Sequence, residues 1–514
     1  MTDQITDEFV PDEVIPHGNL PPMRYRDLPP AISWIRMVGP SIMLAGLALG
    51  SGEFILWPYI TYKSGFIFFW ACMLGVVTQF FINMEIERWT LATGESAITG
   101  FCRLSRHWAW VMLLLNILPW AWPGWATGAG TMLSWIVFGP EQSVNADGQI
   151  VFAAPYVAEF GIAGLVLVGI VLTAGPVVYN TVERLQTILV GLILTLLVVL
   201  AIIVVRFDAV AAMATGIINI GEIPDLDQHN LTLMGLLGAL AFAGAGGTTN
   251  LGQSNYIKDK GYGMGRYIGR ITSPITGQEE AISDAGYHFP MTTENVARWR
   301  SWWRAANIEH FFSFFITCVV CLCLMSLVSY SLFYDVDGQL KDGMGQYAQG
   351  MSFLWGEATV LGERPSGNLL KYCFLFMGMA VLLTSELGIL DLVARISTDI
   401  VKVNFLRESQ FWSQSKLYYC FLWGEICLGI GILCVPNFDK PLFLLVASAA
   451  MNGGVMFIYS GLLLYMNKKI LHPSLSIRWL RVLVMIWACV FFGYFCLQAV
   501  KGEVVPYLLG LFSE

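Results

Sequence analysis

The sequence has little charge. Asp, Glu, Lys and Arg make up 13% of its 514 residues, whereas hydrophobic residues make up 56%. Soluble domains carry roughly 25% charged residues. A chain with so few charged side chains cannot cover a large apolar core with a polar surface. The composition therefore excludes an ordinary soluble domain and indicates a protein surrounded by lipid.

Several patterns of enzymes and binding modules are also missing. The sequence contains no ATPase motif, no His and Cys spacing typical of zinc sites and no nucleophile constellation. The run GYGMGRYIG, residues 261–269, is not a nucleotide loop, because no predicted strand precedes it. We therefore expect no enzymatic activity, no cofactor and no nucleic-acid partner.

Long apolar runs predict eleven membrane-spanning helices, since about 20 apolar residues cross the hydrocarbon. They lie near 36–60, 66–87, 108–138, 157–177, 186–206, 231–257, 307–332, 371–394, 415–435, 441–466 and 480–499. All but one of the 11 Cys lie in or at the edge of these runs, so no disulfide framework is expected. Residues 1–35 are polar and Pro-rich, lack a cleavable signal and are predicted to be a cytosolic tail.

The distribution of basic residues predicts the orientation. With the N-terminus in the cytosol and the C-terminus outside, 22 of the 29 Lys and Arg residues fall on the cytosolic side, as the positive-inside rule requires. A multi-pass protein of the inner or plasma membrane, monomeric and in contact with membrane lipid, is expected. The largest cytosolic loop covers 258–306, and its end, TTENVARWRSWWRAANIEH, is typical of an interfacial amphipathic helix.

Two apolar runs are interrupted by helix-breaking residues. The first contains LGSGEFI (49–55), and the sixth contains AFAGAGGTTNLGQSN (241–255). Gly-broken segments that open two blocks of five helices indicate an inverted repeat, here 36–206 and 231–466, followed by an eleventh helix at 480–499. The glycines alone could serve close helix packing. However, a carboxylate such as Glu53 in mid-span costs about 2.5–3.5 kcal/mol, which favours a binding site.

The order of these segments resembles the Nramp metal transporters, which belong to the LeuT-like (APC) superfamily. The resemblance rests on GPSIMLAG…GSGEF, GESAITGF, GGTTNL, RAANIEHFFSF and LLTSELGILDLVARI. It implies an all-α membrane protein with a 5+5 inverted repeat and broken helices one and six. The family motifs DPGN and MPHN correspond here to GSGE at 50–53 and GTTN at 247–250, where only Gly52 and Asn250 match. The chain would thus be a divergent member without the metal-binding Asp and Met.

The residues left at the two interruptions are the candidate ion-binding or substrate-binding set. They are Gly50, Ser51, Gly52, Glu53, Gly247, Thr248, Thr249 and Asn250. Their donors are oxygen atoms only, which suits a hard cation such as Mg²⁺ rather than Mn²⁺ or Fe²⁺. The sequence therefore predicts a secondary transporter of a divalent cation, with proton coupling as an option. A symporter of a small organic or anionic solute is the alternative, and a transport-dead sensor is a third.

Further polar and aromatic side chains in the spans have two interpretations each. Thr384, Ser385 and Glu386 lie where LeuT-like proteins place coupling-ion ligands, so they are a candidate coupling-ion or proton path. Asp391 is expected to pair with Arg395 as a structural ion pair. Trp120, Trp122 and Trp125 could form a cavity wall, although packing is the simpler interpretation. Glu85 and Glu87 are expected to form a solvated cap beside Arg88.

Overall fold

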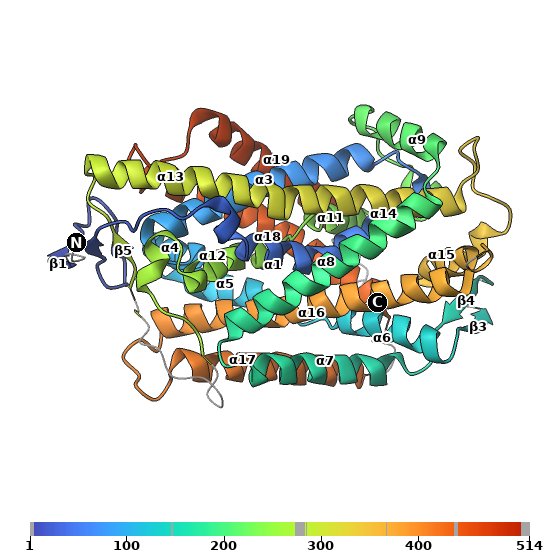
Figure 1. Cartoon of the computed structure of the whole chain (residues 1–514), viewed down its shortest axis with the longest axis horizontal. Helices are drawn as coiled ribbons and strands as arrows, with labels where there is room; N and C mark the ends of the chain where they lie inside the picture. Colours follow the sequence, from blue (N-terminus) through green and yellow to red (C-terminus); the bar gives the residue numbers. More distant parts are fainter. Residues whose placement is uncertain are drawn as a thin grey trace.

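The computed structural model describes residues 5–144, 148–272, 283, 285–365, 367–435 and 440–504. Most helices run along one axis and form a bundle (Figure 1). Its main helices are α1 (Pro40–Ala48), α2 (Trp57–Ser64), α3 (Phe69–Thr93), α4 (Ala97–Leu104), α5 (His107–Ile117), α6 (Gly124–Val137), α7 (Val157–Ala174), α8 (Val178–Val204), α9 (Phe207–Ile218), α11 (Leu233–Ala241), α12 (Thr248–Lys260), α13 (Thr293–His310), α14 (Thr317–Phe333), α15 (Ser352–Gly362), α16 (Gly367–Asn404), α17 (Gln414–Leu433), α18 (Pro441–Lys469) and α19 (Trp479–Ala499).

The eleven predicted spans can all be found in this bundle. Within the described residues, nine helices are long and apolar enough to cross a membrane. The other two predicted spans, the third and the sixth, are each split into two shorter helices: α5 and α6, and α11 and α12. The seventh span is longer than predicted, because α13 continues through the π-helical η4 (Phe311–Ile316) into α14. Its first part is the predicted amphipathic helix, capped by Thr292, whose side chain accepts from the Asn295 N–H.

The spans differ in how deeply they are buried, which identifies the centre of the bundle. The most apolar window of the first span is 94% buried in the protein, whereas that of α7 is 28% buried. Helices such as α7 and α8 leave apolar side chains on the surface, for example Leu167 and Ile188, as expected for helices that face lipid. The first span therefore lies in the centre, packed on α8, α14 and α16.

The two ends of the bundle carry different small sheets. At the end that we call the tail end, β1 (Ile5–Phe9), β2 (Arg24–Arg26) and β5 (Tyr287–His288) form a three-stranded sheet. At the opposite end, β3 (Glu141–Val144) and β4 (Ile150–Ala153) form a hairpin. Figure 1 shows the two sheets far apart along the long axis. The N-terminal tail is thus folded onto the bundle.

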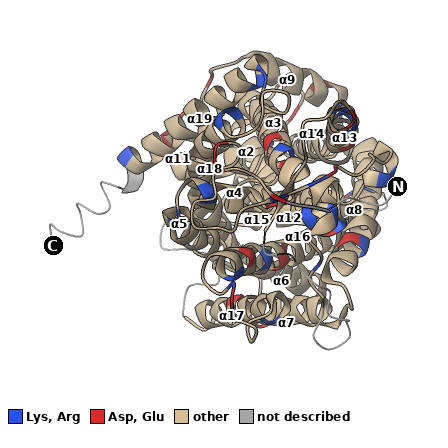
Figure 2. Ribbon diagram, turned by 90° about the vertical axis from the view of Figure 1, so that its left-hand side faces the viewer, with Lys and Arg blue, Asp and Glu red and all other residues tan. Residues whose placement is uncertain are grey.

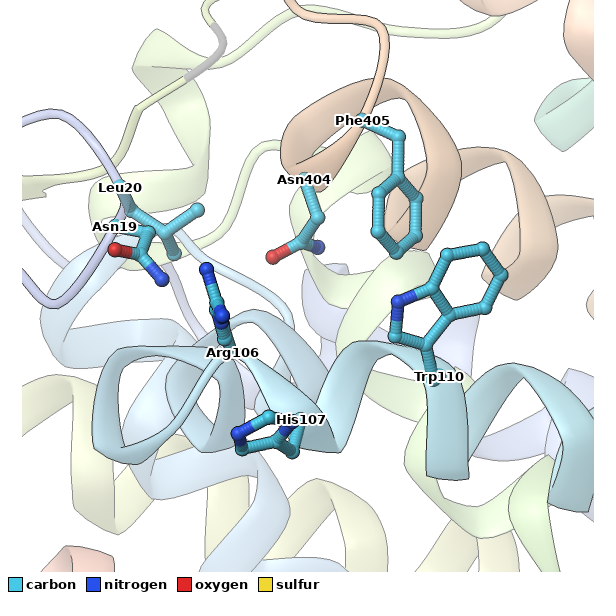
Figure 3. Close-up of a pocket in the computed structure, with 7 residues that line it drawn as sticks. All are labelled: Asn19, Leu20, Arg106, His107, Trp110, Asn404 and Phe405. Carbon is cyan, nitrogen blue, oxygen red and sulfur yellow. The ribbon is translucent and has the colours of Figure 1, made fainter.

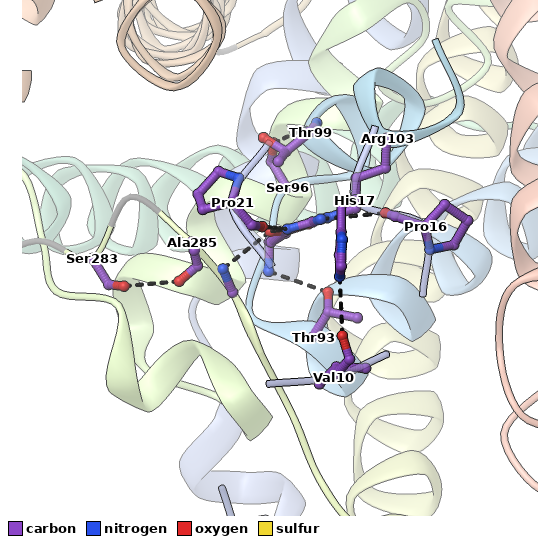
Figure 4. Close-up of polar contacts among 12 residues, drawn as sticks. Val10, Pro16, His17, Pro21, Thr93, Ser96, Thr99, Arg103, Ser283 and Ala285 are labelled. Atoms are coloured by element: carbon purple, nitrogen blue, oxygen red, sulfur yellow. Dashed lines mark hydrogen bonds and ion pairs between the residues drawn. The ribbon is translucent and has the colours of Figure 1, made fainter. Parts of the chain in front are cut away.

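Arg103 holds this tail in place. Its guanidinium pairs with Glu95 at 2.5 Å and also donates to the carbonyl oxygens of Pro16 and Pro21 (Figure 4). The arginine belongs to α4, so the contact fixes the tail to the membrane-embedded bundle. Figure 2, which looks onto the tail end, shows blue and red segments on the ribbon, on an otherwise tan molecule. Some of the charged residues of the bundle form the buried ion pairs described below.

Candidate functional site

The first helix is interrupted by π-helical turns, named η2 (Leu49–Leu56), between α1 and α2. The break expected in helix one at Gly50–Glu53 is therefore not an unwound segment: the chain stays helical with wider turns, and short π-helical segments are frequent at functional sites. The Gly50 N–H donates to Ser385 Oγ at 3.0 Å, and Ser385 Oγ donates to the Leu47 carbonyl oxygen at 2.7 Å. Ser385 on α16 therefore satisfies backbone groups that the irregular turns leave free.

The sixth helix is broken at 242–247, between α11 and α12. Gly244 and Gly247 have φ angles of 115° and 82°, which glycine adopts without the steric cost that other residues incur. The break expected in the sixth helix is confirmed, and it overlaps the predicted stretch from Gly244 to Asn250. Thr248, Thr249 and Asn250, which were expected to belong to this interruption, instead form the first turn of α12.

The two interruptions touch at Gly52. A Cβ atom on Gly52 would lie 1.5 Å from the carbonyl oxygen of Phe242, so the π-helical segment and the break are in backbone contact. Two hydrogen bonds also join α2 and α3 to α11. Trp57 Nε1 donates to the Ala239 carbonyl at 2.9 Å, and Gln79 Nε2 donates to the Ala241 carbonyl at 2.7 Å. The first and sixth helices therefore meet at their two interruptions.

Glu53 points away from the break. It is 1% exposed and lines a cavity of about 10 Å³ whose other lining residues come from η2, α8, α14 and α16. They are Leu49, Phe54, Ile193, Leu197, Cys321, Met325, Met377 and Val381. Neither carboxylate oxygen accepts a regular hydrogen bond from a described residue, and the thiol of Cys318 is its polar neighbour. The structure therefore does not bring Glu53 together with Thr248, Thr249 and Asn250.

Sulfur atoms that were not part of the predicted oxygen-only set lie beside Glu53. Cys321, Met325 and Met377 place a thiol and two thioethers in its cavity, and sulfur favours softer metal ions. These residues were not predicted to lie near Glu53, because they belong to other spans. Among the described residues, no three His, Cys, Asp or Glu side chains are grouped closely enough to hold a metal ion.

The polar side chains at the sixth-helix break are partly engaged. Thr248 Oγ1 accepts from Trp120 Nε1 at 2.8 Å, and Thr249 Oγ1 donates to the Gly246 carbonyl at 2.7 Å. The Asn250 amide is fully buried and makes no regular hydrogen bond, and Tyr459 is its hydrogen-bonding neighbour. Asn452 Nδ2 on α18 donates to the Ser448 carbonyl at 3.1 Å, whereas Asn452 Oδ1 has no partner among the described residues. Asn452 was not predicted.

The tryptophans of the third span pack against the break. The Trp120 ring stacks on Phe242 with 5.7 Å between centroids, and Trp125 lies 5.3 Å from Trp120. Trp120 and Trp125 are buried, whereas Trp122 is partly exposed. Packing, with one hydrogen bond to Thr248, is therefore the role that the structure supports for Trp120 and Trp125.

The three residues of the candidate coupling path on α16 contact different helices. Ser385 contacts the first helix, whereas Thr384 Oγ1 bonds to its own helix and the Thr384 carbonyl accepts from Gln186 Nε2 at 3.0 Å. Glu386 lies beside the backbone of Ala126 on α6 and within electrostatic reach of Glu425 on α17. Glu386 is therefore directed toward α6 and α17, away from η2.

Buried ion pairs connect α12 and α16 near the tail end. Arg395 pairs with Asp391 at 2.9 Å and with Asp259, which confirms the structural pair expected for Asp391. Lys258 pairs with Asp399 at 2.6 Å. These contacts fix α12 to α16 below the break, and Asp259 and Asp399 were not predicted.

The solvated cap expected for Glu85 and Glu87 is wrong. Both side chains are buried. Glu85 pairs with Arg88 at 2.7 Å and with Arg481 of α19 at 3.2 Å. Helix α3 thus carries buried charge into the bundle, where hydropathy alone suggested a surface.

Two larger cavities lie at the ends of the bundle. A vestibule of about 730 Å³ at the opposite end is lined by α2, α6, β4, α11 and α18, and Lys440 is the one charged residue among its described lining. A second cavity of about 360 Å³ at the tail end lies between the tail, α5 and the end of α16 (Figure 3). Its lining includes Arg106, His107 and Trp110.

This arrangement of interrupted, touching helices within one bundle is a fold that solved transporter structures share. A variant of the Eremococcus coleocola manganese transporter is similar to this chain with a TM-score of 0.63 and 12% identity, over 98% of this chain and 92% of that one. The same transporter in complex with an aromatic bis-isothiourea compound has a TM-score of 0.60 and 13% identity, over 92% of this chain and 89% of that one. MhsT in complex with L-phenylalanine has a TM-score of 0.51 and 15% identity, over 91% of this chain and 100% of that one. No protein-family model and no curated protein matches the sequence.

Proposed function

We propose that the protein is a secondary active transporter that moves a divalent cation by alternating access, with proton coupling at Glu53. The fold supports this proposal because it is shared with a manganese transporter and with a structure that binds an amino acid. In such folds, irregular backbone in the middle of the membrane is tolerated where it lines a cavity or a binding site.

The observation that carries the proposal is the carboxylate of Glu53. It is buried in an apolar cavity with no Lys or Arg in its lining. An isolated buried charge is too costly to persist, so the group must be neutralised by a proton or by a cation. A cavity of about 10 Å³ has space for about one small probe sphere and not for a hydrated ion. A proton on Glu53 fits this conformation best.

The cargo site that we propose is the break of the sixth helix. The side-chain oxygens of Asn250 and Asn452 are neutral donors with no regular hydrogen bond from a described residue, and such oxygens favour a hard ion such as Mg²⁺. The sulfur atoms around Glu53 favour a softer ion if Glu53 itself becomes a ligand. Competition between Mg²⁺ and Mn²⁺ therefore reports which of the two positions binds the cargo.

The apolar vestibule favours a second candidate, a symporter of a small organic solute. Its volume of about 730 Å³ is in the range of small-molecule pockets, which are mostly apolar with a few polar groups. Thr131, Asn230 and Thr232 supply such groups in its lining. In this case Glu53 would carry the coupling proton and the solute would bind between the vestibule and the break.

Uptake into proteoliposomes tests these proposals. The panel contains Mg²⁺, Ca²⁺, Mn²⁺ and Na⁺, a set of neutral amino acids, and an internal pH-sensitive dye. For a proton-coupled cation transporter, Glu53→Gln should abolish uptake or separate it from proton movement, while Glu363→Gln, at an exposed carboxylate on the opposite end, should behave as wild type.

Each outcome decides between the candidates. Uptake of Mg²⁺ that excess Mn²⁺ does not suppress supports the cargo site at the break, and Mn²⁺ preference places the cargo at Glu53. Amino-acid uptake alone supports the symporter. Wild-type transport and pH dependence in Glu53→Gln would show that this carboxyl is structural. A protein that binds but transports none of these would be a sensor.

A further inference from the structure

A second group of buried titratable side chains lies outside the site described above. Ser41 of α1, Glu309 and His310 of α13 and Gln253 of α12 meet between the break and the tail end. All four are at most 2% exposed. Glu309 and His310 follow one another in the sequence, and both contact one hydroxyl group from a helix 268 or more positions away.

The hydroxyl of Ser41 bridges the carboxylate and the imidazole. Ser41 Oγ lies 2.5 Å from Glu309 Oε2 and 2.9 Å from His310 Nδ1. A hydroxyl has one hydrogen to donate, so it cannot donate to both at once. If it donates to the carboxylate, it can accept from His310 only when Nδ1 carries a proton. If it donates to Nδ1 instead, Glu309 needs a proton of its own to bond to Ser41.

Gln253 accommodates either arrangement. Its Nε2 lies 3.3 Å from His310 Nδ1, and its Oε1 has no partner among the described residues. Amide nitrogen and oxygen exchange places by a rotation of the group, so Gln253 can donate to a bare Nδ1 or accept from a protonated one. His310 Nε2 is likewise buried without a partner in the described part of the chain, whereas the Glu309 carboxyl has Ser313 of η4 as a second hydrogen-bonding neighbour. The cluster therefore has room for a proton in more than one position.

Charged and titratable groups surround the cluster on every packed element. Helix α3 presents Glu87 toward Glu309, and α12 presents Lys260, which is paired with Glu183 of α8. Tyr262 follows α12 and lies within electrostatic reach of Glu309. Helix α19 presents Arg481 toward His310, and Arg481 is paired with Glu85. Aromatic rings of Phe80 and Phe314 stack on the imidazole, with centroids at 5.6 and 4.8 Å.

We infer that Ser41, Glu309 and His310 form a proton-binding site, separate from Glu53, that ties the start of α1 to α13. With Glu309 ionised, Ser41 donates a charge-assisted hydrogen bond, which is roughly twice as strong as a neutral one. A proton bound to Glu309 replaces this bond by a neutral one. The tie between α1 and α13 is therefore strong without the proton and weak with it.

The consequence for transport rests on the proposed function. Helix α1 leads directly into η2, so its displacement from α13 would open the tail-end side of the central site. A proton that reaches the cluster would loosen α1 there, and release of that proton would restore the tie. The tail end is the side that the basic residues predict to be cytosolic. The site would thus link opening toward the cytosol to proton occupancy.

Hydrogen–deuterium exchange on the purified full-length protein in nanodiscs tests this inference without any cargo. The readout is deuterium uptake by peptides that cover Pro40–Ala48, between pH 5.5 and 8.5, corrected for the intrinsic pH dependence of exchange. In the wild type we expect opening of α1 to be about tenfold more frequent at low pH, the ratio expected between a neutral and a charge-assisted hydrogen bond.

Substitutions at Glu309 and Ser41 show which side chain causes the pH dependence. Glu309→Gln keeps the size of the side chain and should remove the pH dependence. Ser41→Ala should leave α1 in the loosened state at every pH, and it carries the test if Glu309→Gln does not fold. Glu294→Gln and Ser301→Ala change exposed residues of the same helix and should exchange as the wild type does.

Two results would overturn the inference. One is a wild-type pH dependence in Glu309→Gln, and the other is exchange in Ser41→Ala that equals the wild type at high pH. Because no cargo is present, either result leaves the proposed transport function intact. Conversely, a protein that transports nothing in proteoliposomes would still show the exchange pattern if the proton-binding site exists.

Discussion

A methyl group added at Gly52 tests the contact between the two interrupted helices. In Gly52→Ala, the new Cβ would lie 1.5 Å from the Phe242 carbonyl oxygen and 2.6 Å from its carbon, whereas real Cβ contacts stay above 3.0 Å. The atoms it meets belong to the backbone, so no side chain can rotate away. The π-helical segment and the end of α11 must therefore move apart.

The loss of stability caused by Gly52→Ala can be estimated from the typical cost of overpacking. Overpacking in a closely packed interior costs about 1–3 kcal/mol and occasionally more, and a clash with backbone belongs at the upper end. Gly431→Ala on α17 is the matched control, because nothing lies within 4 Å of its Cβ position. Ala is favoured over Gly in a helix by about 1 kcal/mol. The two variants should therefore differ by about 3–4 kcal/mol in stability.

Thermal unfolding in detergent and uptake into proteoliposomes measure the two consequences. We expect Gly52→Ala to lower Tm and to lose transport, and Gly431→Ala to keep both. If Gly52→Ala unfolds at the same temperature as Gly431→Ala and transports at the wild-type rate, the two interruptions are not in contact during the transport cycle. The assignment of the central site to this contact would then fail.

Two further predictions concern polar groups near the tail end. Asp391→Asn removes one of the two carboxylates that pair with the buried Arg395, and Asp259 remains as the other. Unfolding should become easier, by no more than about 3–5 kcal/mol, the cost of leaving a buried charge without a partner. The exposed Glu294→Gln should cost at most about 1 kcal/mol, and chemical or thermal unfolding compares the two variants. Burial lowers the pKa of His288, in β5 outside the spans, to about 4 from 6.5. The unfolded chain binds this proton more readily, so the contribution of His288 to stability is present above about pH 6.5 and is lost as the pH falls toward 4, by about 3 kcal/mol in total. His288→Gln should flatten the dependence of Tm on pH in this window, and the exposed His107→Gln should not; an unchanged slope in His288→Gln would contradict this reading.

The sequence predicts the interruptions better than it predicts what they contact. Clustered glycines and a carboxylate in an apolar run are local signals, and both interruptions occur where these signals lie. The direction of Glu53 is not a local property. A π-helical turn holds an extra residue, which changes where later side chains point, and nothing in LGSGEFI indicates that the break will be π-helical. Glu53 therefore faces Cys321 and Met325 instead of Asn250.

Contacts between segments that are distant in the sequence could not be predicted either, because they too are not local properties. Ser41 and Glu309 are 268 positions apart, and each alone has an ordinary interpretation, as a helix-start serine and as an acidic residue at a membrane edge. Asp259 and Arg395 are likewise far apart, at a separation of 136 positions, so their pairing could not be predicted from local sequence. Hydropathy also placed Glu85 at a surface, because Glu85 lies at the end of an apolar run. A hydropathy pattern contains no information on α19, whose Arg481 packs beside Glu85.

The charge of Lys440 separates the two candidate cargoes. Lys440 lies at the start of α18 and is the one charged residue in the described lining of the vestibule. A cation that enters from this side is repelled by it, whereas a neutral solute is not. Fixed charge at the mouth of a pocket acts mainly on the rate of entry, and salt screens the effect within about 10 Å at 0.1 M.

Lys440→Glu should therefore raise the initial rate of cation uptake several-fold at low ionic strength, and the gain should shrink as salt is added. Lys440→Gln should give an intermediate rate, and Lys416→Glu, an exposed site on α17 outside the vestibule, should change nothing. Initial rates at subsaturating cargo, measured between 20 and 500 mM salt, give the answer. A cation whose uptake does not respond to Lys440→Glu does not pass through this vestibule. A neutral solute whose uptake is equally unaffected, but which is blocked by a bulky substitution such as Gly235→Trp in the same wall, would make the vestibule the entrance of an organic-solute symporter.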